Sequence, residues 1–273
     1  MFLRITPRDN QRPSLAALLP NLLTTLAVCS GLASLHFSLK GELERAVAAI
    51  VVAAIFDALD GRAARLLRVS SKFGAVLDSL SDFLAFGVAP AVVLYQWKLK
   101  GAEVPGSAAA MTYALCAALR LARFTAADMP GAREPAAKAD RPSHFFTGMP
   151  SPAGAGVALL LPMLAFSDTL GFDSPTWLVI AMTFVVGVAM ISRVPMFSLK
   201  GLHVKRHYVA PFLVLVGLIV VAAVRDVWLT LAAMSTIYLL LIPVAWISVR
   251  TRDRRAGASP QAAESTPPPA EHS

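Results

Sequence analysis

The stretch FDALDGRAARLLRVSSKFGAVLDSLSDFLAF, residues 56–86, places four acids inside two runs that are otherwise apolar. They are Asp57, Asp60, Asp78 and Asp82. An ionised carboxylate is costly in hydrocarbon, and acids inside membrane-spanning segments usually mark a functional site. Whether these runs cross a membrane therefore decides both the fold of the chain and the meaning of its acids.

The composition of the chain answers the first question. Of 273 residues, 56% are hydrophobic and only 15% are charged, and the mean hydropathy is +0.62, which is far more apolar than an ordinary soluble domain. Apolar runs of about 20 residues, long enough to cross a hydrocarbon core, recur along the sequence. We predict an all-α, polytopic transmembrane bundle of about eight spans, at residues 15–38, 43–66, 73–97, 107–127, 151–168, 175–197, 207–224 and 227–249.

The distribution of basic residues predicts how the bundle is oriented. Twenty of the 25 Lys and Arg residues fall on the side that carries both termini, which the positive-inside rule assigns to the cytoplasm. We expect a cytoplasmic N-terminal segment at 1–14, a membrane domain at 15–250 and a disordered cytoplasmic tail at 251–273. The net charge of +8 fits this topology and attraction to anionic lipid, and it does not indicate nucleic-acid binding.

Depth and helical angle predict that the four acids form one cluster. At 1.5 Å per residue, the acids of the second and third spans reach a similar level near the cytoplasmic face. At about 100° per residue, Asp57 and Asp60 share one stripe of their helix. Asp78 and Asp82 share one stripe of the next. Two antiparallel helices joined by a short turn can aim these stripes at each other.

A cluster of four carboxylates needs positive charge close by. A hard divalent cation, Mg²⁺ or Mn²⁺, binds carboxylate oxygens together with the phosphate oxygens of a substrate, and two such ions would suit a phosphoryl displacement. The alternative is a structural network in which the acids pair with Arg62, Arg65 and Arg68. We favour the metal site because one-sided stripes of acids in lipid are usually functional.

The spacing D-x2-D-G-x2-A-R-x8-G-x3-D-x3-D, which runs from Asp57 to Asp82, resembles the motif of the CDP-alcohol phosphatidyltransferase family at every fixed position. The resemblance covers about residues 15–250. It implies an integral membrane enzyme in which an alcohol displaces CMP from a CDP-linked lipid, at a divalent-metal site that faces the cytoplasm. It also implies a homodimer in the inner membrane of a bacterium.

The resemblance implies roles for individual positions of the motif. Asp57, Asp60 and Asp78 look like metal ligands. Asp82 looks like the general base, and a possible ligand of a second ion. The positions that resemble those near the CDP moiety are Gly61, Ala64 and Arg65.

Four other segments are similar to the branch of the family whose acceptor is L-serine. They are LPNLLTTLAVCSGLAS (19–34), ALRLARF (118–124), FTGMPSPAGAG (146–156) and MISRVPMFSLKG (190–201). The chain departs from that branch at Thr125, where Asn is expected, and at Gly154, where Ala is more frequent. The implied substrates are CDP-diacylglycerol and L-serine, and the implied products are phosphatidylserine and CMP.

Several polar residues outside the motif are candidates for substrate binding. Arg120 and Arg123 suit the carboxylate of serine and the phosphates of CDP. Ser151 belongs to the same candidate group, and Asn21 and Thr24 could donate hydrogen bonds to the nucleotide. Other interpretations stay open. The arginines could extend to the interface, the Pro and Gly residues around 150–156 could only break and pack a helix, and the polar groups of the first span could bond to neighbouring backbone.

Two kinds of rival function also stay open. The acceptor could be glycerol 3-phosphate or an inositol phosphate, which would require further basic residues around the acceptor. The chain could instead be a cation transporter that uses the same acids as an ion site. Residues 107–249 contain no inverted repeat of the acidic motif, which argues against transport.

Overall fold

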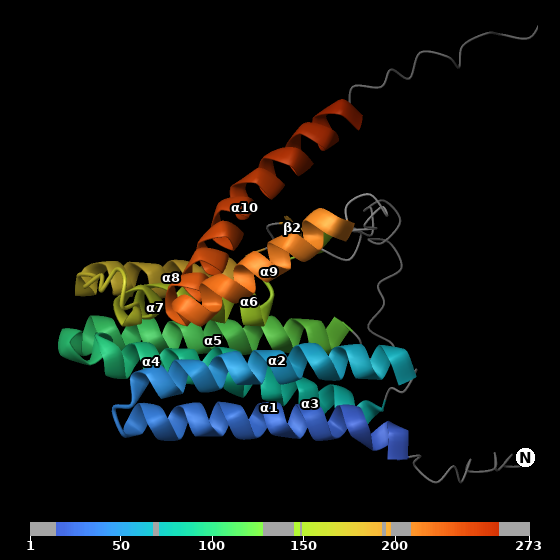
Figure 1. Cartoon of the computed structure of the whole chain (residues 1–273), viewed down its shortest axis with the longest axis horizontal. Coiled ribbons are helices and arrows are strands. Elements are labelled where there is room, and N and C mark those ends of the chain that lie inside the picture. The colour runs from blue at the N-terminus through green and yellow to red at the C-terminus, as the bar shows by residue number, and fades with distance from the viewer. Residues whose placement is uncertain are drawn as a thin grey trace, which may run out of the picture.

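A computed structural model (Figure 1) describes residues 15–67, 71–127, 145–147, 149–192, 195–197 and 209–256. Nearly all of these residues are helical, and each predicted span contains helical structure, although the span at 175–197 extends beyond the end of α8 into the strand β2. The elements in chain order are α1 Leu15–Leu39, α2 Leu43–Leu67, α3 Lys72–Asp82, the π-helix η1 Phe83–Val88, α4 Ala89–Trp97, the 3₁₀-helix η2 Leu99–Ala102, α5 Glu103–Ala127, β1 Phe145–Thr147, α6 Ser151–Ala158, α7 Leu160–Phe166, α8 Thr176–Ile191, β2 Pro195–Phe197, α9 Val209–Arg225 and α10 Val227–Ala256.

Two short strands are a departure from the predicted all-α fold. β1 and β2 pair antiparallel, with Phe146 opposite Met196. The strands join the segment that precedes α6 to the segment that follows α8. Backbone groups that leave a helix still need hydrogen-bond partners, and a short ladder between two neighbouring segments supplies them.

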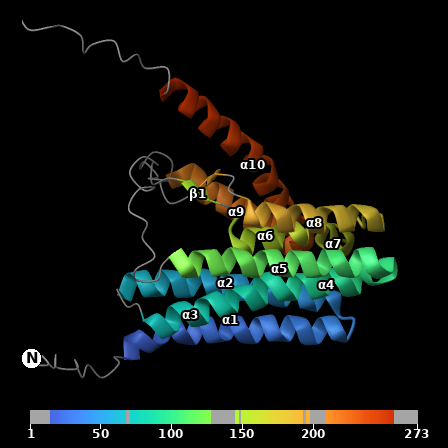
Figure 2. The same cartoon turned by 180° about the vertical axis from the view of Figure 1, so that it is seen from behind.

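The long helices of the first half of the chain lie side by side. Figures 1 and 2 show α1, α2, α5 and the continuous rod formed by α3, η1 and α4 in this arrangement, with α6, α7 and α8 beyond α5. α9 and α10 diverge from the bundle, and α10 extends furthest from it. Close approach of α5 and α8 depends on Gly187, because a Cβ there would lie only 3.1 Å from the Cα of Tyr113.

The outer surface of the bundle is apolar. On α9 the side chains of Leu213, Val221 and Val224 are 63%, 70% and 84% exposed. Within the described residues two helical segments, Leu18–Leu39 and Phe73–Trp97, are long and apolar enough to cross a membrane, and shorter apolar helices occupy Thr176–Ile191, Leu213–Arg225 and Val227–Leu241. These features fit an α-helical membrane protein. The number of spans and the side on which the termini lie stay predictions.

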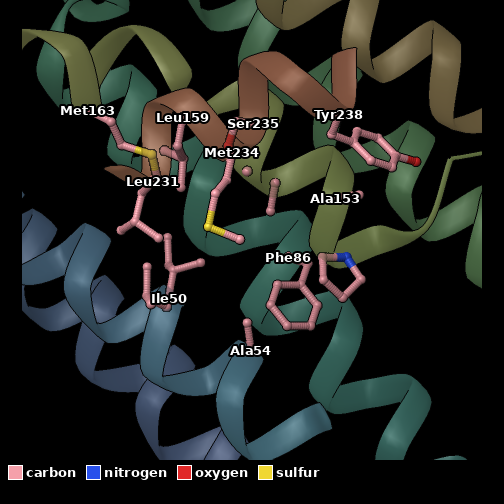
Figure 3. A pocket seen from close by; sticks show the side chains of 14 residues that line it. Ile50, Ala54, Phe86, Ala153, Leu159, Met163, Leu231, Met234, Ser235 and Tyr238 are labelled. Atoms are coloured by element: carbon pink, nitrogen blue, oxygen red, sulfur yellow. The ribbon is translucent and has the colours of Figure 1, made fainter. Parts of the chain in front are cut away.

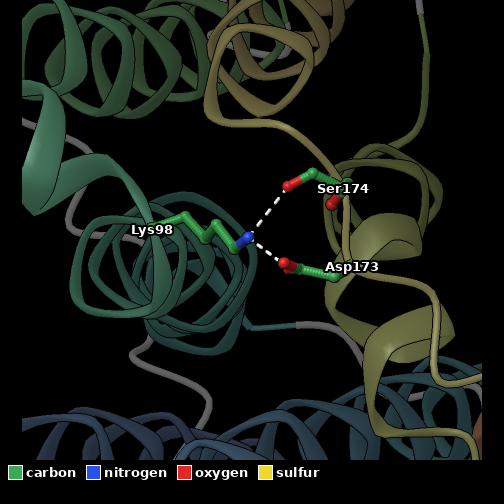
Figure 4. A network of polar contacts seen from close by, with 3 residues as sticks. All are labelled: Lys98, Asp173 and Ser174. Carbon is green, nitrogen blue, oxygen red and sulfur yellow. Dashed lines mark hydrogen bonds and ion pairs between the residues drawn. The ribbon is translucent and has the colours of Figure 1, made fainter.

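One end of the bundle, where α4 and α7 end and α10 begins, is held together by polar and aromatic contacts. Lys98 forms an ion pair with Asp173 and donates a hydrogen bond of 2.9 Å to the carbonyl of Ser174 (Figure 4). Asp226, between α9 and α10, accepts hydrogen bonds from Ser167 (2.6 Å) and from the backbone N–H of Leu229 (2.9 Å). The rings of Trp97, Phe166 and Trp228 meet edge to face. We call this group of contacts the clamp end.

Two of the predicted spans are interrupted rather than uniform helices. The span at 151–168 contains α6 and α7, which meet at Leu159. The span at 73–97 contains the π-helix η1. At the C-terminus α10 continues to Ala256, which is inside the segment predicted as a tail. The predictions for residues 1–14 and 257–273, and for Arg68, fall outside the described residues.

Candidate metal centre

The structure brings three of the four motif aspartates together. Asp57 and Asp60 lie on the second half of α2, and Asp78 lies on α3. One carboxylate oxygen from each of these three residues lies within 4.8 Å of the other two. This convergence agrees with the stripes that helical periodicity predicts.

Asp82 is the last residue of α3 and lies beside the same group. Its carboxyl group is within hydrogen-bonding reach of that of Asp57. Its Oδ1 atom is buried and has no hydrogen-bond partner among the residues that the structure describes. A buried polar atom without a partner is costly, so an unfilled acceptor at this position indicates a role in binding or chemistry. We call Asp57, Asp60, Asp78 and Asp82 the acidic cluster.

Arg62 and Arg65, the basic residues of the α2–α3 region whose side chains the structure describes, do not neutralise the acidic cluster. The side chains of Arg62 and Arg65 are exposed, and neither forms an ion pair with a described aspartate. The structural network that we considered as an alternative is therefore absent within the described part of the chain. A cluster of carboxylate oxygens with an unfilled acceptor, and without an ion pair to Arg62 or Arg65, fits a hard divalent metal.

Thr24 of α1 orients one of the aspartates. Its Oγ1 lies 2.7 Å from Oδ2 of Asp60 and 3.0 Å from the carbonyl oxygen of Pro20. Thr24 and Asp60 are 4% and 5% exposed, so water has little access to this contact. A hydroxyl group has only one proton to donate. If Thr24 donates it to the carboxylate of Asp60, no second proton is left to donate to a nucleotide.

Two glycines of the motif have opposite surroundings. A Cβ at Gly74 would lie 2.8 Å from Oδ1 of Asn21 and 3.0 Å from Oγ of Ser71. Ser71 caps α3 by accepting a 2.9 Å hydrogen bond from the N–H of Gly74. Gly74 thus lets α1 approach α3, with Asn21 at the contact. A Cβ at Gly61 would meet nothing within 4 Å, so the packing of the described residues does not require glycine there.

Arg120 and Ser151 are brought together next to the acidic cluster. Nη1 of Arg120 on α5 donates a hydrogen bond to Oγ of Ser151, the first residue of α6, which is 1% exposed. Arg120 also lies close enough to Asp82 for a direct electrostatic interaction. The two residues therefore place a guanidinium and a hydroxyl at the edge of the carboxylates.

The structure gives other sequence candidates different surroundings. Nη1 of Arg123 donates a 2.8 Å hydrogen bond to the carbonyl of Ile191, so this side chain caps the end of α8. Ala64 is half-buried and Arg65 is exposed on the last turns of α2.

Tyr113 and Tyr238, which sequence reasoning missed, both lie near Arg120. Tyr113 could have been found from its spacing of seven residues from Arg120 on one helix, whereas no sequence signal indicated Tyr238 on α10.

An apolar cavity of about 330 Å³ lies next to the centre, between α2, η1, α6, α7 and α10. Figure 3 shows Phe86 and Tyr238 at one end of the cavity, and Leu159 and Met163 at the other. The segments that carry polar site residues also line the cavity. Ala54 precedes Asp57 by one turn of α2, Phe86 follows Asp82 by one turn, and Pro152 follows Ser151. The cavity is thus continuous with the elements of the polar site.

Comparisons with known proteins give matches over most of the chain. The family model described as CDP-alcohol phosphatidyltransferase matches residues 17–189, and the one described as CDP-alcohol phosphatidyltransferase 2 matches residues 207–243. The chain is similar to a CDP-diacylglycerol–serine O-phosphatidyltransferase of Mycobacterium leprae, at 38% identity over 88% of this chain and 77% of the relative. Relatives with the same name occur in Mycobacterium tuberculosis, at 35% identity over 85% and 79% of the two chains, and in Bacillus subtilis, at 29% identity over 69% and 92%.

Proposed function

The chain belongs to the CDP-alcohol phosphatidyltransferase family, and on that premise we propose that it transfers a phosphatidyl group from CDP-diacylglycerol to L-serine. The products are phosphatidylserine and CMP. The names of its relatives support the substrates. The observation that carries the chemistry is the convergence of three carboxylates within 4.8 Å, next to a fourth with an unfilled oxygen.

Asp57, Asp60 and Asp78 would bind one divalent cation. Asp82 would be a ligand of a second cation. Bound Mg²⁺ or Mn²⁺ would neutralise charge on the diphosphate and on the departing CMP. Thr24 supports the site from α1 by fixing the carboxylate of Asp60. Loss of a group that orients a metal ligand in this way typically lowers metal affinity or activity about 10- to 100-fold.

Asp82 acts as the general base in this mechanism. The hydroxyl oxygen of serine attacks the phosphorus that bears diacylglycerol, the bond from that phosphorus to the CMP oxygen breaks, and the hydroxyl proton passes to Oδ1 of Asp82. The buried position of that oxygen, without a described partner, supports this role because it is free to accept a proton.

Arg120 and Ser151 provide the acceptor site. The guanidinium of Arg120 pairs with the carboxylate of serine, and its bond to Ser151 fixes the orientation of the guanidinium fork. Arg120 lies close to Asp82, so a carboxylate bound to it would place the adjacent hydroxyl near the base. Arg123 would support this site indirectly, since its bond to Ile191 fixes α5 against α8.

Gly61, Ala64 and Arg65 would accommodate the CDP moiety on the last turns of α2. The open space around Gly61 supports this assignment, because glycine there has no packing reason within the described residues. Asn21 lies at the contact of α1 with α3 and would face the same moiety. The enzyme would work on the cytoplasmic face of a bacterial cell membrane, which the predicted charge distribution supports. The family resemblance implies that it would do so as a homodimer.

The apolar cavity would hold one acyl chain of CDP-diacylglycerol. Its lining is hydrocarbon over almost its whole surface, and it begins one helical turn from Asp57 and Asp82. Gly156→Leu would narrow the cavity, whereas Gly217→Leu on α9 adds the same side chain where a Cβ meets nothing within 4 Å. We expect Gly156→Leu alone to lower kcat/KM for long-chain CDP-diacylglycerol more than for a water-soluble short-chain analogue. Equal losses for both substrates would remove the cavity from the mechanism.

Release of CMP by the purified full-length protein tests the function. L-serine, glycerol 3-phosphate and an inositol phosphate are offered in turn with CDP-diacylglycerol and Mg²⁺ or Mn²⁺. We expect CMP with L-serine alone, and no CMP once a chelator removes the metal. CMP with one of the phosphorylated alcohols would change the acceptor and keep the chemistry, whereas activity that a chelator leaves intact would reject the metal centre.

A further inference from the structure

The helix that carries Asp82 changes its winding immediately after this residue. In η1 the backbone N–H of Ala89 donates to the carbonyl of Leu84, five residues earlier, instead of four as in an α-helix. A π-turn therefore contains one residue more than an α-turn. Each residue of a helix contributes about 100° of rotation, so the side chains before η1 are turned by that angle relative to those after it, compared with an uninterrupted α-helix.

Pro90 accounts for the change in winding. In an α-helix the carbonyl of Phe86 would accept a hydrogen bond from the N–H of residue 90. Proline has no N–H, and its ring collides with the carbonyl four residues earlier. Phe86 is 1% exposed, so water cannot readily replace the missing donor.

Tyr113 supplies the donor that Pro90 lacks. Its hydroxyl on α5 donates a 2.9 Å hydrogen bond to the carbonyl oxygen of Phe86, and the side chain is fully buried. Gly87 permits the close approach of α5, because a Cβ there would lie 3.0 Å from the Cβ of Ala117. Tyr113 and Ala117 are one turn apart, so the same face of α5 packs along η1.

The position of Asp82 depends on this contact. α4 is fixed by its packing, with Ala89, Val93 and Leu94 fully buried. The rotation taken up in η1 therefore decides which way the last residue of α3 points. Arg120, one further turn along the same face of α5, is close enough to Asp82 to interact with it electrostatically. The face of α5 that holds the π-turn also forms the edge of the acidic cluster.

We propose that Pro90 and Tyr113 act together as positioning residues for Asp82, by holding η1 in the π-turn that aims this carboxylate at the reacting hydroxyl. The inference rests on the proposed function for the role of Asp82. The roles of Pro90 and Tyr113 in forming η1 do not depend on it, and the two parts can be tested separately.

The experiment compares full-length Tyr113→Phe, Pro90→Ala and the double variant with wild type. Tyr95→Phe on α4 is the control, because the hydroxyl of Tyr95 bonds to no residue in the described part of the chain. Amide hydrogen exchange over residues 83–91 reports the winding, and CMP release reports kcat and KM. We expect Tyr113→Phe to exchange faster in this segment and to lose about 10- to 100-fold in kcat, with an unchanged KM for CDP-diacylglycerol.

The double variant separates positioning from simple stabilisation. Pro90→Ala restores an N–H that can bond to the carbonyl of Phe86, so protection from exchange should return while kcat stays low, because an α-turn rotates Asp82 away. Tyr113→Phe should also cause no further loss of kcat in an Asp82→Asn background.

Two results would overturn the proposal: a double variant that regains kcat together with protection from exchange, or a Tyr113→Phe variant whose kcat matches that of Tyr95→Phe. If wild type released no CMP, the proposed function would fail, and unchanged exchange in Tyr113→Phe would separately reject the π-turn mechanism.

Discussion

The acidic cluster and the clamp end differ in how far their charged groups are compensated by neighbouring groups. At the clamp end Lys98 faces Asp173, and Asp226 accepts hydrogen bonds from a hydroxyl and a backbone amide. In the acidic cluster three carboxylates crowd within 4.8 Å and the fourth has an unfilled buried oxygen. Neither Arg62 nor Arg65 forms an ion pair with any of the four, whereas Arg120 interacts electrostatically with Asp82.

This difference distinguishes residues that stabilise the helical bundle from residues whose charge is suited to binding a ligand. Matched polar groups lower the free energy of the folded chain, whereas crowded like charges raise it unless something binds them. Changes in the acidic cluster should therefore affect chemistry and metal affinity more than stability. Changes at the clamp end should affect stability alone.

Asp82→Asn should give the largest effect. Loss of the general base is expected to lower kcat about 10²- to 10⁴-fold, while the fold is retained because one like charge is removed from the cluster. CMP release and thermal unfolding measure the two quantities. Asp173→Asn at the clamp end, where the side chain is 84% exposed, is the control and should keep kcat. Near-normal turnover in Asp82→Asn would take this residue out of the mechanism.

Thr24→Val should weaken metal binding by about 10- to 100-fold, since Thr24 orients Asp60. The Mn²⁺ concentration needed for half-maximal CMP release and the shift in unfolding temperature with Mn²⁺ both report this affinity. The neighbouring Thr25→Val is a matched control, because the hydroxyl of Thr25 is exposed and bonds back to the carbonyl of Asn21. Equal Mn²⁺ affinities in the two variants would contradict a supporting role for Thr24.

Two alanine substitutions should separate packing from binding within the motif. Gly74→Ala should destabilise the protein by about 1–3 kcal/mol, because the added Cβ overpacks the contact with Asn21. Gly61→Ala should stabilise the helix by about 0.5–1 kcal/mol and still raise KM for CDP-diacylglycerol. Thermal unfolding measures the change in stability of each variant, and CMP release measures KM. A Gly61→Ala variant with unchanged KM would show that the open space there is not used by the nucleotide.

Asp226→Asn should give the smallest effect, seen only in how stability depends on pH. The hydrogen bond from Ser167, followed by that from the N–H of Leu229, lowers the pKa of Asp226. A carboxylate with a lowered pKa stabilises the fold above its unfolded value of about 3.9, and this contribution is lost as pH falls through the folded value. The difference in unfolding temperature between wild type and Asp226→Asn should therefore shrink below about pH 4. A constant difference would contradict this assignment.

The parts of the site that follow helical periodicity could be predicted from sequence. Asp57, Asp60 and Asp78 converge because stripes on two antiparallel helices face each other, and that geometry is contained in the spacing. The helices themselves follow from long apolar runs. The contact of Arg120 with Ser151 agrees with their joint assignment to the acceptor site, although spacing alone does not reveal it.

The parts that depend on contacts between distant segments could not be predicted. The bond from Thr24 to Asp60 joins residues 36 positions apart, and only the packing of α1 against α2 creates it. The π-turn requires Tyr113 as well as Pro90, and a proline alone predicts a kink without its form. Arg123 was grouped with Arg120 because both are basic and close in sequence, yet its side chain points to the end of α8.

The extra residue in η1 also bears on how sequences of this kind are compared. Deleting one residue from Phe83–Val88 would remove the extra residue of the π-turn, with the apolar surface of the rod largely kept. Such a change looks minor in an alignment, since it is a gap of one position in a hydrophobic stretch. Two proteins that differ by this gap would share the bundle and have their fourth aspartate facing different neighbours, so chain length within this segment is a sharper guide to shared chemistry than overall identity.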